Sequence, residues 1–598
     1  MKTQTIAHRR AARAVAPAAL ALAVAAALWA PASHAFRFGS EEGLSGSFDS
    51  TLSFGLIGRT QSPGCQSIGN DSGGCNNGTN NELQARQGAG GYANADFNFT
   101  NFDDGSLNYK KGDIVSAVLK GTHDLSLKLP GGWSSLVRMT WFHDFKADDT
   151  RRTGVADEAS GDVTLLDAWV AKSFSIGERN GKIKLGNQVI SWGEDIFILG
   201  GVNQINAIDL QKFHVPGTQL KEIFIPAPML SGSLGLSENL GVEAYYQFAW
   251  NGFKFDPAGT FFSTADVLGE GRRVAYVPTS IIEDVAGPGA CAGLPNGRCG
   301  DASGLSDADA IAAGIAVPYL GTRKPRRAGQ YGVNLRYNAE DIDTEFAFTY
   351  QRYHDKLPFL GFTGSPDGAV TGYFVAYGEN KDLYAISANT KIANVAVGAE
   401  LSYRPQDSVG VDPTVPSGSL AGAFDRNSVY DVGRHPGFVE EEKYQFHLTG
   451  FYTFSHNDPL GGLAKAIGAS DGFILAEAAV THYPGLDTSG RIPYFLPNYA
   501  LPDKTSWGYV AEIGMNYPNA FGSGVTLTPQ IDWYHDVSGT SPNAIPFVEG
   551  RKALTVSLFA NYRDRWKGAL QWVTFAGGGA NNLMRDRDFV SASLSYSF

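Results

Sequence analysis

The sequence predicts an all-β protein: a transmembrane, antiparallel outer-membrane β-barrel of about 18 strands, within a range of 16–20, with long extracellular loops and an inward-folded segment. Three observations predict this class. The chain begins with an export signal, its strands carry one apolar and one polar face, and its connections alternate between short and long. Together these features are typical of outer-membrane barrels.

The N-terminus has the features of a secretory signal peptide over residues 1–35. Three arginines between residues 9 and 13 precede an apolar run over 14–30, and a small-residue stretch ends at Ala35. A charged start, a short apolar centre and a small-x-Ala end are typical of export and cleavage. We therefore expect cleavage after Ala35, localisation to the outer membrane of a Gram-negative cell, and one barrel domain over 36–598.

The composition narrows the classes of protein and partner. Hydrophobic residues make up 43% and aromatic residues 12% of the chain, and the formal net charge is −12. No second apolar run is long enough for a spanning helix, and only helices and closed barrels satisfy all backbone hydrogen bonds in a bilayer. A nucleic-acid partner is not expected, because it would require a basic surface. The expected partners are outer-membrane lipids and the barrel assembly machinery.

The C-terminal strand shows the clearest alternation of apolar and polar residues. One face carries Val590, Ala592, Leu594, Tyr596 and Phe598, and the other carries the serines at 591, 593, 595 and 597. A terminal aromatic strand resembles the signal that the assembly machinery recognises, which assigns Tyr596 and Phe598 to assembly. The same alternation recurs at 47–56, 331–337, 444–454 and 506–517.

The connections between these strands alternate in length. Short turns are expected at 130–132, 179–182, 238–239, 393–394 and 563–565. Long polar segments are expected near 59–113, 146–162, 251–328, 354–382, 405–442, 484–505, 536–551 and 576–588. Asn180-Gly181 is a strong two-residue hairpin signal. We expect a short helical turn near 456–471 at the periplasmic rim.

The cysteines form two local pairs in loops rich in Gly, Asn and Pro: Cys65 with Cys75, and Cys291 with Cys299. Export to an oxidising compartment favours two loop disulfides over free thiols, and the spacings fit no usual zinc site. No catalytic residue, metal or cofactor is expected. The sequence 468–472 fits a nucleophile elbow only superficially, since a strand rather than a helix follows it.

The segment 193–229 interrupts the strand alternation with a mixture of charged and bulky apolar residues. We single out Trp192, Glu194, Asn203, Asn206, Asp209, Lys221 and Glu222 as candidate site residues. Its apolar side chains should be buried: Ile196, Phe197, Ile198, Leu199, Phe213, Leu220, Ile223, Phe224 and Ile225. One interpretation is an inward fold that constricts the lumen, with Asp209 and Glu222 paired to basic residues. The other is a packed outer loop or a part of the barrel wall.

Charged residues also fall on the expected lumen faces of strands. These are Glu345, Glu400, Arg404 and Glu512. Rings of charge set selectivity in pores, so these residues could define a permeation path. A salt-bridged interior that only holds the barrel together is the alternative, and it fits most of them better.

Several motifs resemble those of a proteobacterial outer-membrane family of large β-barrels, catalogued as domain of unknown function thirteen-oh-two. The resemblance runs nearly end to end. The motifs on which it rests lie at 101–105, 111–113, 191–194, 201–203, 205–209, 216–217, 220–222, 400–404, 535–537 and 586–588. The resemblance implies a barrel whose relatives accompany a periplasmic lipid-binding-like protein and an inner-membrane transporter of the resistance-nodulation-division type.

Three functions are consistent with these observations. A channel or transporter for hydrophobic or amphipathic compounds is favoured by the resemblance and by the apolar content of 193–229. A general or polar-solute porin is favoured by the polar lumen alone. A structural or assembly barrel, or a barrel enzyme, is the third. The sequence does not identify the cargo.

Overall fold

The computed structural model describes residues 36–598, except 41–42, 70–71, 73, 75–100, 148–156, 278–285, 295–304, 365–369, 412–432, 489–491, 493 and 498–499. The expected signal peptide lies outside these residues and stays a prediction.

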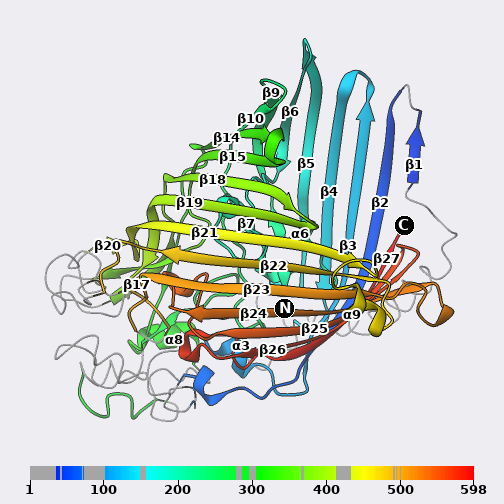
Figure 1. Cartoon of the computed structure of the whole chain (residues 1–598). Coiled ribbons are helices and arrows are strands. Elements are labelled where there is room, and N and C mark those ends of the chain that lie inside the picture. The colour runs from blue at the N-terminus through cyan, green and yellow to red at the C-terminus, as the bar shows by residue number, and fades with distance from the viewer. Residues whose placement is uncertain are drawn as a thin grey trace.

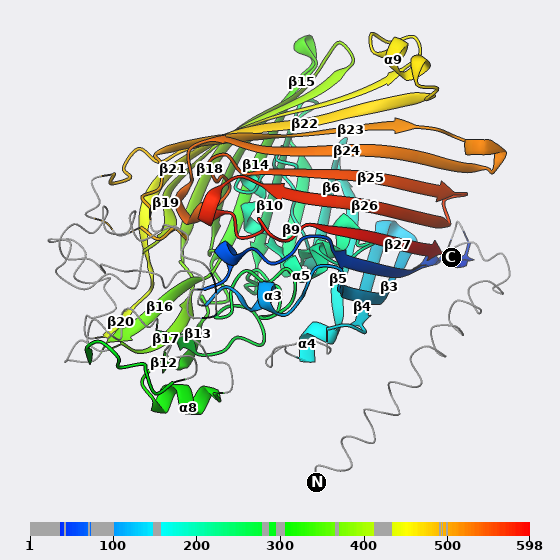
Figure 2. The same cartoon turned by 90° about the horizontal axis from the view of Figure 1, so that it is seen from below.

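Eighteen antiparallel strands form one closed barrel, which confirms the expected fold class (Figures 1 and 2). The strands are β2 (Ser45–Arg59), β3 (Ile114–Leu129), β4 (Trp133–Asp144), β5 (Gly161–Ile176), β6 (Arg179–Gln188), β9 (Ala227–Gly235), β10 (Leu240–Gln247), β14 (Gln330–Ala339), β15 (Thr344–Tyr353), β18 (Lys381–Ile392), β19 (Val395–Gly410), β21 (Phe438–Ser455), β22 (Asp471–His482), β23 (Thr505–Asn516), β24 (Val525–Ser538), β25 (Lys552–Tyr562), β26 (Trp566–Ala576) and β27 (Phe589–Ser597).

The barrel closes between its first and last long strands. β2 pairs with β3 along one edge and with β27 along the other, from Thr51 opposite Ser597 to Arg59 opposite Phe589. The short strand β1 (Phe36–Gly39) pairs with residues 45–48 of β2, which precede the part of β2 that pairs with β27. Because of this closure, each of the eighteen barrel strands in the described part of the chain has a partner on both sides, so the backbone hydrogen bonds of the wall are satisfied within the protein.

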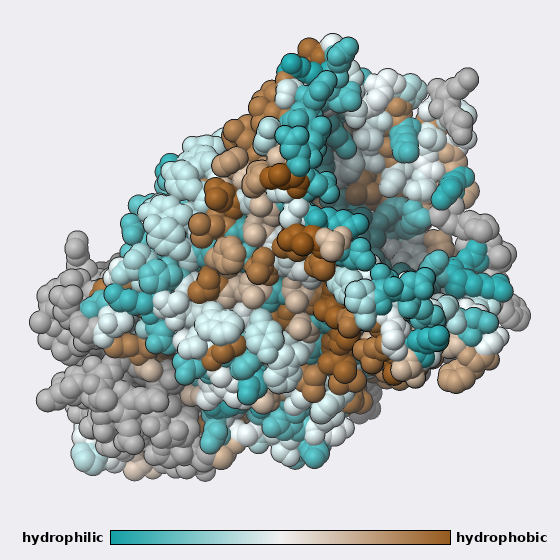
Figure 3. Space-filling model, viewed as in Figure 1, coloured by the Kyte–Doolittle hydropathy of each residue, from teal (hydrophilic) through white to brown (hydrophobic). Residues whose placement is uncertain are grey.

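The two faces of the wall differ as the alternation predicts. Large apolar side chains such as Val163, Phe348 and Leu570 are exposed on the outer face, and Figure 3 shows apolar residues gathered across the middle of the outer wall. The inner face is polar: Ser53 and Ser595 hydrogen-bond across the seam at 2.7 Å. An apolar exterior and a polar interior are the arrangement that a bilayer and a water-filled lumen require.

Short turns lie at one end of the barrel and long connections at the other. The turns at 130–132, 236–239, 393–394 and 563–565 agree with the expected positions. The hairpin at Asn180-Gly181 is wrong, because these residues pair with Ser175 and Phe174 in the β5–β6 ladder. The turn is Gly177-Glu178, where Gly177 has a φ of +61° that glycine adopts without steric cost.

The loops carry small elements of their own. The helices are α3 (Asp104–Leu107), α4 (Asp157–Ser160), α5 (Leu210–Phe213), α6 (Leu220–Ile223), α8 (Asp307–Ala312) and α9 (Gly461–Ala466). The loop strands are β7 (Ala207–Ile208), β8 (Phe224–Ile225), β11 (Ala275–Tyr276), β12 (Ala316–Val317), β13 (Tyr319–Arg323), β16 (Phe359–Gly364), β17 (Val370–Ala376) and β20 (Gly433–His435). Within the described ranges, none of the helices is long and apolar enough to span a bilayer. α9 is the helical turn expected near 456–471.

Two of the four cysteines lie in the described residues. Cys65 and Cys291 are each disulfide-bonded. Cys75 and Cys299, the partners expected from sequence, lie outside the described residues. The pairing within each loop therefore stays a prediction.

Candidate functional site: a segment across the lumen

The connection between β6 and β9, residues 189–226, enters the barrel and contacts opposite sides of its inner wall. The expected boundary of 193–229 is slightly wrong, since residues 227–229 belong to β9 and pair with β6. One end of the segment contacts β19 and β22, and the other contacts β3. β3 and β19 lie on opposite sides of the ring of strands. We call residues 189–226 the crossing segment.

The first half of the crossing segment is held by two wall carboxylates. Glu400 on β19 accepts hydrogen bonds from the backbone N–H of Glu194 at 2.9 Å and of Val202 at 2.7 Å. Glu477 on β22 accepts three, from the N–H groups of 196, 197 and 198, at 3.2, 2.5 and 3.1 Å. Backbone N–H groups that converge on an anion make strong, charge-assisted hydrogen bonds.

Further wall groups complete this attachment. His447 on β21 donates from Nδ1 to Glu477 at 2.7 Å, and both side chains are 0% exposed. Gln445 donates to the carbonyl of Leu199 at 2.9 Å, and Arg404 donates to the carbonyl of Gly201 at 3.2 Å. Five backbone N–H groups and two backbone carbonyls of residues 194–202 are therefore bound by side chains of the wall.

The start of the crossing segment packs against the wall between β9, β10 and β15. Trp192 Nε1 donates to Glu243 on β10 at 2.6 Å, and the Trp192 ring lies 5.2 Å from that of Tyr245. Asn203 accepts from the N–H of Trp192 at 3.2 Å, and Asn206 donates to the carbonyl of Ile190 at 2.7 Å. These asparagines join the ends of a tight loop, and they contact the segment itself rather than the open lumen.

The second half of the crossing segment is held by ion pairs on the opposite wall. Lys120 on β3 lies 2.5 Å from Glu222, and both side chains are almost fully buried. Lys221 lies 2.8 Å from Asp124, which also binds Arg138 at 2.8 Å. Because an unpaired buried charge is costly, these pairs fix the position of α6 against β3.

Asp209 has two cationic neighbours and a capping role. Its Oδ1 accepts from the N–H of Lys212 at 3.0 Å and so caps α5. The ammonium groups of Lys212 and Lys254 lie 3.8 and 3.9 Å from Oδ2. Burial raises the pKa of Asp209, and the two lysines oppose that shift. The lysines thus stabilise a carboxylate that burial alone would disfavour.

Close approach of the segment to the wall depends on a glycine. A Cβ at Gly55 on β2 would lie 2.6 Å from the Cβ of Pro216. The next residue, Gly217, faces the serines of the seam, and a Cβ placed there would lie 3.5 Å from that of Ser593. The crossing segment therefore rests directly on the β2–β27 closure.

Not all apolar side chains of the crossing segment are buried, contrary to the expectation from sequence. Ile198 and Ile223 are buried, but Ile196 is 52%, Leu199 38%, Phe213 59% and Leu220 69% exposed. Backbone amides and ion pairs, not burial of these four side chains, attach the segment to the wall. The crossing segment therefore carries several exposed apolar side chains inside a barrel whose inner wall is polar.

Among the titratable groups of the crossing segment, Asp195 has the pKa that is shifted most. Asn203 Nδ2 donates to its carboxylate at 2.8 Å. Burial, and then the carboxylate of Glu400, raises the pKa of Asp195 to about 7. His447 opposes this shift, and Glu477 adds to it. Asp195 therefore changes charge in the neutral range, next to the two carboxylates that hold the backbone.

The four lumen charges predicted from the sequence differ in what they contact. Glu400 and Arg404 bind the crossing segment, as described above. Glu345 lies 2.8 Å from Arg336, which also lies 3.4 Å from Glu243, so it belongs to a salt-bridged row of the wall. Glu512 faces Asp532 on the neighbouring strand and contacts no part of the crossing segment in the described residues.

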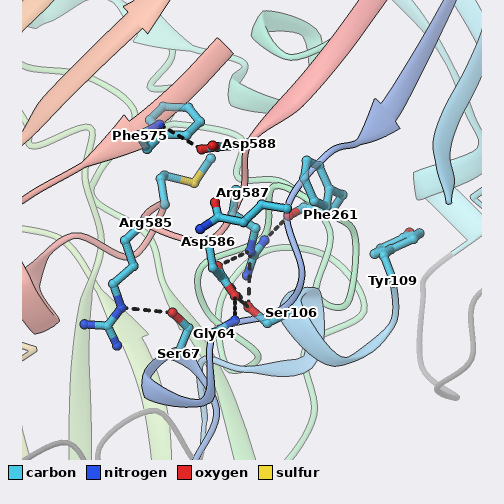
Figure 4. A network of polar contacts seen from close by, with 12 residues as sticks. Gly64, Ser67, Ser106, Tyr109, Phe261, Phe575, Arg585, Asp586, Arg587 and Asp588 are labelled. Carbon is cyan, nitrogen blue, oxygen red and sulfur yellow. Dashed lines mark hydrogen bonds and ion pairs between the residues drawn. The ribbon is translucent and has the colours of Figure 1, made fainter. Parts of the chain in front are cut away.

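The extracellular mouth is held by a second network, shown in Figure 4. Asp586 accepts from Arg59 at 3.2 Å, from Ser106 at 3.2 Å and from the N–H of Gly64 at 3.0 Å. Arg587 donates to the carbonyl of Phe261. These contacts join the β2–β3, β10–β14 and β26–β27 loops at the Arg59–Phe589 end of the β2–β27 seam.

Glu477, His447, Gln445 and Lys120 were missed by sequence reasoning as site residues. Each is a polar residue on the inner face of a strand whose other face is apolar. Glu477 interrupts the apolar stretch Ile474 to Val480, which was a usable signal. Its target, however, lies about 280 residues away in the chain, so only the fold reveals what it binds.

The fold and the site define a membrane β-barrel whose lumen is crossed by one of its own loops. The chain belongs to the family described as "Protein of unknown function (DUF1302)", whose model matches residues 16–598. This confirms the family resemblance seen in the sequence motifs. No curated protein matches the chain.

Solved structures similar to this chain include three outer-membrane proteins. OccAB1 of Acinetobacter baumannii is 9% identical, with 94% of this chain and 99% of that chain covered and a TM-score of 0.38. OpdK of Pseudomonas aeruginosa with vanillate is 8% identical, with coverages of 92% and 98% and a TM-score of 0.38. OmpF of Salmonella typhi with daunomycin is 7% identical, with coverages of 94% and 100% and a TM-score of 0.33. At these scores we draw no conclusion about cargo.

Proposed function

We propose that the chain is an outer-membrane channel for hydrophobic or amphipathic compounds that the crossing segment closes at rest. The observation that carries this proposal is the attachment of one loop to opposite walls, by Glu400 and Glu477 on one side and by Lys120 on the other. A segment fixed at both sides of a lumen obstructs passage until one attachment is released.

The cargo class follows from the surface that the crossing segment presents. Ile196, Leu199, Phe213 and Leu220 are exposed although burial of each would contribute about 1.5–3 kcal/mol. Exposed apolar groups in a polar channel are suited to contact an apolar ligand, since such contact removes both surfaces from water. Small ions gain nothing from such contacts.

The proposed partners rest on the family resemblance. A periplasmic lipid-binding-like protein would carry an apolar cargo through water, and an inner-membrane transporter of the resistance-nodulation-division type would supply the energy. A barrel has no energy source of its own, so directional transport of a sparingly soluble compound requires such partners. The arrangement is therefore a partner-gated channel.

A polar-solute porin is the second candidate, favoured by one observation. Arg138 lies 2.8 Å from Asp124 and 2.6 Å from Asp167, and Arg336 lies between Glu243 and Glu345, so two charged rows line the inner wall. Such rows could select small polar solutes. This candidate requires free space beside the crossing segment, whereas the first requires its movement.

A disulfide tether tests whether movement of the segment is needed. Cβ atoms at 217 and 593 would lie 3.5 Å apart, within the range that a disulfide spans. The variant Gly217→Cys/Ser593→Cys in the outer membrane of intact cells, where the proposed partners are present, should lose uptake of a hydrophobic dye, N-phenylnaphthylamine, when oxidised and regain it on reduction. Wild type and the Gly217→Cys single variant under both conditions control for the loop disulfides and for the cost of a side chain at Gly217.

The two candidates give different results in this experiment. Dye uptake that depends on the reduced tether, with no passage of sugars in liposome swelling, supports the proposed function. Sugar passage that is equal in the oxidised and reduced states would instead support the porin.

A further inference from the structure

Three buried carboxylates from two distant loops converge at the extracellular mouth. Asp103 and Asp104 lie in the β2–β3 loop at the start of α3, and Asp266 lies in the β10–β14 loop. One oxygen of each lies within 4.8 Å of the others. The cluster thus joins two loops that are about 160 residues apart in the chain.

Only one of the two oxygens of Asp266 accepts hydrogen bonds from the backbone of this pair of acids. Its Oδ2 accepts from the backbone N–H of Asp103 at 3.0 Å and of Asp104 at 3.4 Å. Its Oδ1 is buried and has no hydrogen-bond partner among the described residues, and the residue is only 7% exposed. A buried carboxylate oxygen without a donor or cation is costly, so this atom indicates a missing ligand.

Two arginines close to the cluster make their direct contacts with other groups. Arg587 lies 3.3 Å from Asp586 and donates to Phe261, and Arg273 lies 2.5 Å from Asp307. Neither of these arginine contacts involves Oδ1 of Asp266, which has no hydrogen-bond partner among the described residues.

The frame around the cluster is preorganised. Asn101 donates to the carbonyl of Tyr276 at 3.0 Å and accepts from its N–H at 2.8 Å. The N–H of Asp266 donates to the carbonyl of Asn101 at 2.8 Å. The two loops are thus already aligned, and a ligand bound by the three acids would not have to bring them together.

We propose that Asp103, Asp104 and Asp266 bind a divalent cation, with Ca²⁺ preferred, that clamps the β2–β3 loop to the β10–β14 loop. Oxygen-only donors suit hard cations, and Ca²⁺ tolerates irregular sets of carboxylates and carbonyls better than Mg²⁺ does. Zn²⁺ would favour His or Cys ligands, and the cluster contains neither. No metal site was predicted from the sequence, and these three acids meet only in the folded chain.

Isothermal titration of CaCl₂ into the full-length barrel, refolded in detergent and freed of metal with EGTA, tests this proposal. We expect one equivalent of Ca²⁺ to bind saturably, and Asp266→Asn and Asp104→Asn each to weaken binding at least tenfold. The matched control is Asp309→Asn, an exposed acid of α8 in the same β10–β14 loop, which should bind as wild type does. Heat-modifiable migration on a gel verifies that each variant is folded.

A second measurement does not depend on the variants. Limited proteolysis of wild type should cut the two loops more slowly with Ca²⁺ than with EGTA. The proposal is overturned if wild type shows no saturable binding, if Asp266→Asn binds Ca²⁺ as tightly as Asp309→Asn, or if Mg²⁺ binds equally well. None of these results depends on whether the barrel conducts, so the proposed channel function is tested separately.

Discussion

Glu477 on β22 accepts a hydrogen bond from His447 on β21 with one oxygen and three backbone N–H groups of the crossing segment with the other. The pair is fully buried, so the imidazole fixes the carboxylate in the position that holds residues 196–198. The attachment of the segment on this side of the lumen therefore depends strongly on one wall carboxylate.

The substitution Glu477→Gln should weaken this attachment. A neutral amide replaces charge-assisted hydrogen bonds of about 1.5–3 kcal/mol with neutral ones of about 0.5–1.5 kcal/mol. We expect the amides of 196–198 to exchange hydrogen about tenfold faster, measured by mass spectrometry of the folded barrel. Glu345→Gln is the matched control, because Glu345 pairs with Arg336 on the wall instead. Equal exchange in both variants would show that Glu477 does not hold the segment.

The losses of stability caused by substituting Lys120 and Glu222 should not be additive, because the two side chains form a buried ion pair. The variant Lys120→Met leaves Glu222 buried without its cation, which costs about 3–5 kcal/mol in comparable pairs. The double variant Lys120→Met/Glu222→Met should recover most of this loss. Thermal unfolding of the four proteins in detergent gives the coupling energy; purely additive losses would mean that the pair does not fix α6.

Attachment of the crossing segment should weaken as pH rises towards neutrality. The pKa of Asp195 is raised to about 7 from 3.8, so the attached segment binds its proton more tightly than the released segment does. Attachment is then favoured below pH 4, falls between about pH 4 and 7 and is constant above 7. Hydrogen exchange of 194–202 at pH 5 to 8, corrected for intrinsic rates, should show this trend, and Asp195→Asn should remove it. A trend that persists in Asp195→Asn would assign it to Glu400, Glu477 or His447.

Deletion of Phe598 should impair assembly of the barrel. Its backbone exchanges two hydrogen bonds of 2.9 Å with Ser50, and its ring stacks on Tyr596 at 5.7 Å. The deletion removes both the end of the seam and the terminal aromatic signal. Heat-modifiable barrel in cell envelopes should fall severalfold, whereas Phe598→Tyr should assemble normally. Wild-type levels in the deletion would contradict this role.

The sequence was sufficient for the fold and insufficient for the attachments inside it. Alternation such as Val590 to Phe598 predicts a strand with two faces, and enough such strands predict a barrel. Asn180-Gly181 misled because turn propensity is local, whereas register is set by the whole β5–β6 ladder. The exposed Phe213 and Leu220 were expected to be buried, because burial was assumed to be the force that fixes the segment. Long-range contacts such as Glu477 with residues 196–198 have no local signature.

The most direct test of the central claim is the single-channel conductance of a barrel that lacks most of the crossing segment. Residues 194–223 are replaced by a Gly/Ser linker, and the matched control replaces α8, residues 307–312, in the same way. The claim that the crossing segment closes the lumen predicts a large, steady conductance for the first variant and near silence for wild type and the α8 control in planar bilayers. Equal conductance in all three folded proteins would contradict it.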